Sequence, residues 1–187
     1  MVPESRLVAD LLLQKVDAAR WKQAIEVENR LRKRSPTTAS TKAGLIRGRL
    51  QTMTPDLWRL VRDGDKPIAT QAVLAATLKY SPLLADFLDL VMRDLYRRFE
   101  EQLKPSHWDR YLEDCRTRDP RMPAWADGTL ISLRTRVFGM LTEAGYLADA
   151  RRRILMVPTL SPALVHHLNA QGEDDILRCM QVGSRQR

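Results

Sequence analysis

The chain of 187 residues has little of what metal sites and disulfides are built from, with only 2 cysteines and 3 histidines. Cys115 and Cys179 have no CxxC or metal-ligand spacing, so we expect two reduced thiols rather than a disulfide. His166 and His167 are adjacent and would point to different sides of a helix, which argues against joint ligation of a metal. The sequence therefore predicts no metal site and no cofactor.

Long apolar runs and enzyme motifs are also missing. No stretch reaches the roughly 18–20 apolar residues that a membrane-spanning helix needs. The first segment is interrupted by Asp10, which is unlike a secretory signal, so we expect a cytoplasmic protein with no membrane partner. There is no glycine-rich phosphate loop and no nucleophile elbow, so we do not expect an enzyme. Carboxylates gathered by the fold, as in a nuclease, stay open as an alternative.

Acidic residues are absent from one segment, Arg30–Arg49, which contains 7 basic residues and several hydroxyls. Basic side chains neutralise phosphates, and hydroxyls and free N–H groups at a helix start bond phosphate oxygens. The alternative is a solvated helix face. We predict nucleic-acid contacts from the following residues of this segment: Arg30, Arg32, Lys33, Arg34, Ser35, Thr37, Thr38, Lys42, Arg47 and Arg49.

The positive charge is unevenly distributed along the chain. Residues 1–60 hold 12 Lys or Arg against 6 Asp or Glu, residues 61–150 hold 13 against 14, and residues 151–187 hold 6 against 3. Two basic ends on either side of a near-neutral middle favour an anionic partner. Arg151, Arg152 and Arg153 form a second candidate contact, for which a solvated turn is an equal alternative.

Helical periodicity covers most of the chain and predicts a predominantly all-α fold, a compact helical bundle. The basic N-terminal part has the helix-break-helix outline of a helix-turn-helix. A winged-helix-like C-terminal end rests on one short strand, expected at Arg151–Val157. We expect a basic subdomain over 1–65 and a helical core over 66–187, which could form one compact domain. Expected helices cover 7–19, 21–31, 37–52, 55–62, 67–79, 81–102, 106–115, 129–144, 161–171 and 173–180.

The aromatic residues follow the spacing of helix cores rather than that of an RNA-stacking surface. On α-helical spacing, Leu45, Ile46 and Leu50 are expected to form one packing face. The aromatic residues that we expect to pack inside are Trp21, Trp58, Tyr80, Phe87, Phe99 and Phe138.

Three groups of residues, taken in order and spacing, resemble the BrxA family of BREX bacteriophage-exclusion systems. The first is Arg32–Thr38 (RKRSPTT) followed by Leu45–Leu50 (LIRGRL), and the second is Leu78–Leu88 (LKYSPLLADFL). The third is Leu141–Leu147 (LTEAGYL) followed by Arg153–Pro158 (RILMVP). No single group is diagnostic, and the resemblance covers roughly residues 6–182.

The resemblance implies a small, mostly helical, non-enzymatic DNA-binding protein of bacterial anti-phage defence. The family is similar in outline to helical nucleic-acid-binding proteins of transcription antitermination, and its members work beside a methyltransferase, ATPases and a phosphatase-like protein. Family members have been labelled inner-membrane proteins, for which this sequence gives no physical support. We therefore expect a double-stranded DNA partner. The alternatives are RNA binding, or a scaffold whose basic ends dock other BREX proteins.

Overall fold

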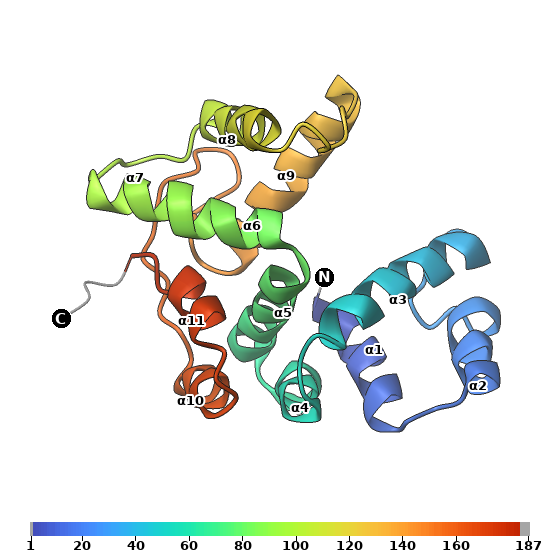
Figure 1. The fold of residues 1–187 in the computed structure, drawn as a ribbon. Helices are drawn as coiled ribbons and strands as arrows, with labels where there is room; N and C mark the ends of the chain where they lie inside the picture. The colour runs from blue at the N-terminus through green and yellow to red at the C-terminus, as the bar shows by residue number, and fades with distance from the viewer. Residues whose placement is uncertain (1, 184–187) are drawn as a thin grey trace. The chain divides into compact units, whose positions relative to one another are not determined.

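The computed structural model describes residues 2–183, in which helices form nearly all of the regular structure (Figure 1). Within this range no strand forms, and there are two isolated β-bridges, Gln102 with Ile154 and Leu147 with Leu155. The predicted all-α class is confirmed. The contacts divide the chain into two compact units, described separately below.

Unit 1 comprises the chain up to Ser81 together with Leu160–Ile176. Its helices are α1 (Val2–Leu13), α2 (Ala18–Lys22), the π-helical turn η1 (Gln23–Val27), α3 (Pro36–Leu50), α4 (Pro55–Asp63), α5 (Lys66–Tyr80) and α10 (Pro162–Ala170). The α5 helix contacts α1, α3, α4 and α10, and residues 69–78 are all buried. A helix that is apolar on all sides needs partners on all sides, so α5 forms the centre of this unit.

The division differs from the predicted boundary at residue 65 because α5 cannot be separated from the helices that cover it. Unit 1 therefore runs on to Ser81 and includes α10 from late in the sequence. The C-terminal residues of the predicted 66–187 region, 184–187, lie outside the described residues. Truncating Leu74 in α5 to alanine should cost about 2–5 kcal/mol of stability, since the side chain is 2% exposed.

The α3 helix packs through a narrow stripe of small and branched side chains: Ala39, Ala43, Ile46 and Leu50. These spacings of three and four residues place them on one side of the helix. The predicted face was wrong in one position, because Leu45 lies beside this stripe and is 37% exposed. The two alanines let the α3 backbone lie close to the helices it covers, α1 and α5.

Unit 2 comprises Pro82–Thr159 and the chain from Leu177 onward, so the boundary falls inside α11 (Asp174–Met180). Its first helix runs from Pro82 to Arg97 as α6 (Pro82–Asp86), the π-helical stretch η2 (Phe87–Met92) and α7 (Arg93–Arg97). Helices α8 (Pro105–Arg118) and α9 (Asp127–Glu143) follow. Phe87, Trp108 and Tyr111 form an aromatic cluster, with ring centroids 4.8–5.9 Å apart. The offset and edge contacts of such rings stabilise a core beyond their buried area.

Several element boundaries differ from the predicted ones. The first helix ends at Leu13 rather than at Ala19, because Lys15 takes a left-handed backbone and Asp17 caps the next helix. The helix from Pro82 ends at Arg97, not Gln102, and Phe99 follows with φ +55°. Phe99 was predicted to be a core residue, but it is 83% exposed because the helix has already ended.

The two finer fold predictions are not confirmed. Eight residues separate η1 from α3, whereas a helix-turn-helix usually has a turn of three or four. The expected strand at Arg151–Val157 contributes two isolated bridges rather than a wing. Among the aromatic residues, Tyr80 is 47% exposed, so its predicted core position was also wrong.

Candidate nucleic-acid interface

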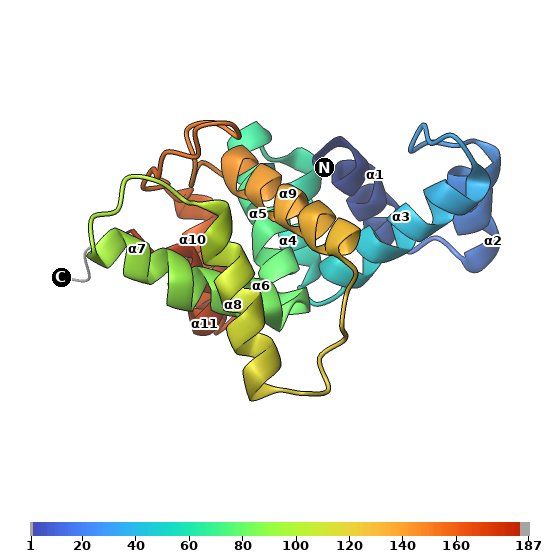
Figure 2. The same ribbon diagram turned by 90° about the horizontal axis from the view of Figure 1, so that it is seen from above.

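The loop between η1 and α3, residues 28–35, carries five of the ten contact residues predicted in the basic segment, and Asn29 orders its backbone. Asn29 Nδ2 donates to the carbonyl oxygen of Lys33 at 2.7 Å, and Lys33 N donates to Asn29 Oδ1 at 2.8 Å. Asn29 itself has φ +45°, which asparagine tolerates better than most residues. Both views of the fold show this loop joining α2 and η1 to the start of α3 (Figures 1 and 2). The loop is thus an ordered turn.

Three arginines extend from this ordered loop into solvent. Arg30, Arg32 and Arg34 are exposed, and no ion pair or side-chain hydrogen bond engages them among residues 2–183. Arg32 has φ +51°, a left-handed backbone that is uncommon for a residue other than glycine. The turn therefore holds one residue in a strained backbone conformation. It presents three arginines that no acidic side chain of the described chain neutralises.

The start of α3 uses the Ser35 hydroxyl as its cap, and that hydroxyl also lies 2.9 Å from Thr38 Oγ1. Ser35 has φ −143°, and its Oγ accepts from the Thr38 N–H at 3.2 Å, with Pro36 at the first helical position. The helix therefore begins at Pro36 rather than at Thr37 or Thr38. Thr37 and Thr38 are exposed on the first turn. The positive end of the helix dipole adds to the cations of the loop before it.

Lys33, unlike the three arginines beside it, forms an ion pair within residues 2–183. Its Nζ lies 2.8 Å from Glu4 Oε1 on α1, and the two side chains are 27% and 21% exposed. Burial is the largest single effect on Glu4 and raises its pKa, but the hydrogen bond from Lys33, a backbone hydrogen bond and nearby positive charge together lower the pKa of Glu4 below its usual value. Lys33 thus fastens the loop to α1 and is less available to a phosphate than sequence alone suggests.

The basic residues of α3 lie on two flanks of the helix. Arg47 stacks its guanidinium over the Trp21 ring, 4.7 Å from the centroid, on the side that also bonds η1 through Ser40 and Glu26. Lys42 and Arg49, seven residues apart, share the other flank. Trp21, predicted to be in the core, is only half-buried and holds this arginine in place.

The second candidate cluster lies in unit 2 on a turn fixed by Asp149. Asp149 Oδ1 accepts from the backbone N–H groups of Arg151 and Arg152, and the bond from Arg152 is the main cause of a lowered pKa for Asp149. Arg153, with φ +57°, donates from Nε to the Leu103 carbonyl oxygen at 3.2 Å. The side chains of Arg151 and Arg152 therefore remain exposed, whereas the side chain of Arg153 is bonded to the backbone of Leu103. The two basic clusters belong to different units.

The feature that sequence reasoning missed is a set of acidic partners from outside the basic segment. Glu4 and Glu26 reach Lys33 and Ser40 of the acid-free segment, while Glu28 pairs with Arg20. Glu26 also lines a hollow of about 450 Å³ beside Thr37 and Thr41. A carboxylate there repels phosphate, so the hollow itself is a poor phosphate site and the exposed arginines beside it are better contacts.

Among residues 2–183, no group of three or more His, Cys, Asp or Glu is placed to hold a metal ion. No helix of the described chain is long and apolar enough to cross a membrane.

Comparison with known proteins gives consistent matches over nearly the whole chain. A family model described as BrxA matches residues 1–172. The BREX protein BrxA of Paramagnetospirillum magneticum is 48% identical over 181 residues, covering 97% of this chain and 91% of the relative. The BREX protein BrxA of Escherichia coli O9:H4 is 32% identical over 181 residues, covering 97% and 85%.

A solved structure agrees with the fold. The crystal structure of an uncharacterized protein from Magnetospirillum magneticum matches with a TM-score of 0.89 and 45% identity, covering 97% of this chain and 93% of that chain. The sequence relatives and the family model agree with the resemblance seen in the three residue groups. The chain belongs to the BrxA family, the BrxA proteins of BREX phage-defence systems.

Proposed function

We propose that this protein is a non-enzymatic accessory protein that binds double-stranded DNA, mainly through phosphate contacts, in BREX phage defence. The observation that carries the proposal is the ordered loop that presents Arg30, Arg32 and Arg34 without acidic partners among residues 2–183. Arginine pairs well with phosphate, and a fixed loop loses little conformational entropy when it binds. Because its ligand is DNA, the proposal places the protein in the bacterial cytoplasm.

The proposal divides the DNA-contacting residues into main and secondary contacts. Arg30, Arg32, Arg34, Lys42, Arg47 and Arg49 supply the main cations, and the exposed hydroxyls of the first α3 turn add hydrogen bonds. Lys33 contributes less because Glu4 already bonds it. Arg151 and Arg152 supply a secondary contact from unit 2.

A salt series on the full chain tests the proposal. With about six phosphates neutralised, log K for a fluorescent duplex should fall with log salt at a slope of about −5.4. A flat salt dependence contradicts phosphate-dominated binding.

Competition separates the two nucleic acids. Unlabelled duplex DNA should displace the labelled duplex at lower concentration than a structured RNA of equal length. Preferential displacement by the RNA would reassign the ligand to RNA, because A-form helices present phosphates and 2′-hydroxyls in a different arrangement.

A further inference from the structure

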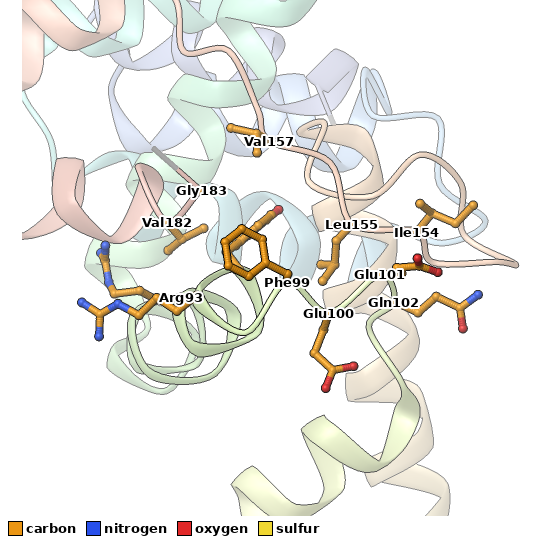
Figure 3. A pocket seen from close by; sticks show the side chains of 12 residues that line it. Arg93, Phe99, Glu100, Glu101, Gln102, Ile154, Leu155, Val157, Val182 and Gly183 are labelled. Atoms are coloured by element: carbon orange, nitrogen blue, oxygen red, sulfur yellow. The ribbon is translucent and has the colours of Figure 1, made fainter. Parts of the chain in front are cut away.

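A groove of about 780 Å³ lies within unit 2, beside the end of α7 (Figure 3). One wall is the α7 end and residues 99–102, and the other includes Ile154, Leu155 and Val157. Val182 and Gly183 complete the lining. The volume lies within the range of pockets that hold organic ligands.

Phe99 gives the groove an apolar surface that the fold does not cover. Its side chain is 83% exposed and its backbone has φ +55°, an uncommon combination for an aromatic residue. Val157, also in the lining, is 57% exposed. Figure 3 shows Phe99 between Arg93 at one end and Glu101 and Gln102 at the other. Apolar side chains gathered in a hollow with a polar rim are typical of an interaction site.

The backbone at Gln102 forms an isolated bridge beside this surface, and the outer edge of that bridge is open. Leu103 N donates to the Arg153 carbonyl at 3.0 Å and Leu155 N donates to the Glu101 carbonyl at 2.9 Å, on either side of the Gln102–Ile154 bridge. In this antiparallel pattern the N–H and C=O of Gln102 point away from Ile154. Neither group has a backbone partner in the described part of the chain. An extended peptide can hydrogen-bond to such an edge.

The two ends of the groove differ in charge. Arg93 is held by Asp89 and by the Arg178 carbonyl, and Arg97 lies near it in the lining. At the other end, the carboxylates of Glu100 and Glu101 form no ion pair among residues 2–183. Two unpaired carboxylates repel phosphates and attract a cation, so nucleic acid is disfavoured here and a basic polypeptide segment is favoured.

We propose that this groove binds a short, extended, basic-apolar segment of a protein partner. The segment pairs its backbone with Gln102, places an apolar side chain on Phe99 and Val157, and sets a lysine or arginine beside Glu100 and Glu101. This inference is independent of DNA binding, which rests on residues of unit 1 and on the Asp149 turn.

Peptide binding to the full-length chain tests this proposal. The probes are three fluorescein-labelled, C-terminally amidated peptides: STVKVKS, its acidic counterpart STVEVES and its polar counterpart STSKSKS. Fluorescence anisotropy should show STVKVKS binding at least about tenfold more tightly than either counterpart. No binding of any probe up to about 1 mM, or equal binding of all three, overturns the proposal.

Matched variants assign the binding to the groove. Gln102→Pro removes the outward N–H but leaves the Leu103 and Leu155 bonds, and it should weaken STVKVKS binding about tenfold, whereas Gln102→Ala should not. Glu100→Lys with Glu101→Lys should reverse the preference toward STVEVES. If Gln102→Pro does not fold, as judged by circular dichroism, Phe99→Ser replaces it, since an exposed side chain is removed with little effect on folding. Two folded variants decide the outcome: Gln102→Pro (or Phe99→Ser in its place) and the charge-reversed Glu100→Lys with Glu101→Lys. If each of them binds STVKVKS as tightly as the parent does, the proposal is overturned.

Discussion

The turn at Asn29–Arg34 in unit 1 and the turn at Asp149–Arg153 in unit 2 share a backbone device and differ in their surroundings. In each, a short polar side chain bonds backbone groups two to four residues ahead, and an arginine takes a left-handed backbone. The first turn adjoins a helix start and further cations on α3, and Glu4 fastens it. The second has two exposed arginines, and the α8 start beside it adds one lysine, the N-cap Lys104, next to the Leu103 that Arg153 bonds. A run of arginines therefore becomes a strong or a weak candidate site according to what the fold places beside it.

Charge reversal at the two turns gives the largest expected difference. Arg32→Glu with Arg34→Glu should weaken duplex binding about a hundredfold at moderate salt, because two phosphate contacts are lost and repulsion is added. The matched pair Arg151→Glu with Arg152→Glu should weaken it about tenfold or less. Fluorescence anisotropy measures both, with circular dichroism to confirm folding. A larger loss in the second pair would place the main contact in unit 2.

Removing the side chain that fixes the first turn tests whether the loop is ordered by Asn29. Asn29→Ala should lower the free energy of unfolding by about 1–2 kcal/mol, since two hydrogen bonds are lost and alanine disfavours φ +45°. Asn29→Gly should fall between the alanine variant and the parent, because glycine adopts the left-handed backbone without strain. Urea unfolding provides the measurement, and parent-like stability of Asn29→Ala would show that other contacts order the loop.

Neutralising Arg32 and Lys33 one at a time distinguishes a side chain that contacts DNA from one that holds the loop to α1. Arg32→Gln should reduce the magnitude of the salt slope by about 0.9, as expected for one lost phosphate contact. Lys33→Gln should change the slope less, because Lys33 is bonded to Glu4. Glu4→Gln should strengthen duplex binding by a few-fold through release of Lys33. Equal slopes for the two neutralised cations would mean that Lys33 leaves Glu4 when DNA binds.

The smallest expected effect is the pH dependence of the Glu4–Lys33 pair. The folded-state pKa of Glu4 lies below its ordinary value of 4.5, so its contribution is present above that pH and is lost as the pH falls through the lowered value. Thermal midpoints measured from pH 7 to pH 3 should show a shallower decline in Glu4→Gln than in the parent. Identical profiles would show that the ion pair contributes nothing to stability.

Much of the fold was predictable because helix starts and stops have local causes. Pro36, Pro82 and Pro162 each begin a helix close to the predicted position. The spacing of apolar residues predicted most of the remaining helices, since amphipathic helices repeat every three to four residues. The errors at Leu13 and Phe99 occur where a left-handed residue ends a helix that apolar spacing would extend.

The candidate site was predictable only in part. Sequence showed an acid-free basic segment and identified the residues that carry its charge. It did not show that Glu4 forms an ion pair with Lys33, that Arg47 stacks on Trp21, or that Ser35 caps α3. These partners come from other helices, and no local pattern encodes a contact across 29 residues of chain.

By itself the sequence determined the all-α class, the basic character of residues 30–49 and the resemblance to the BrxA family. These follow from propensity, spacing and composition, which act between near neighbours. Only the tertiary structure decided which arginines stay unpaired, that Phe99 lies in a groove, and that α10 joins the unit built around α5. Those outcomes depend on which surfaces are buried against which others, and burial is a property of the whole chain packed together.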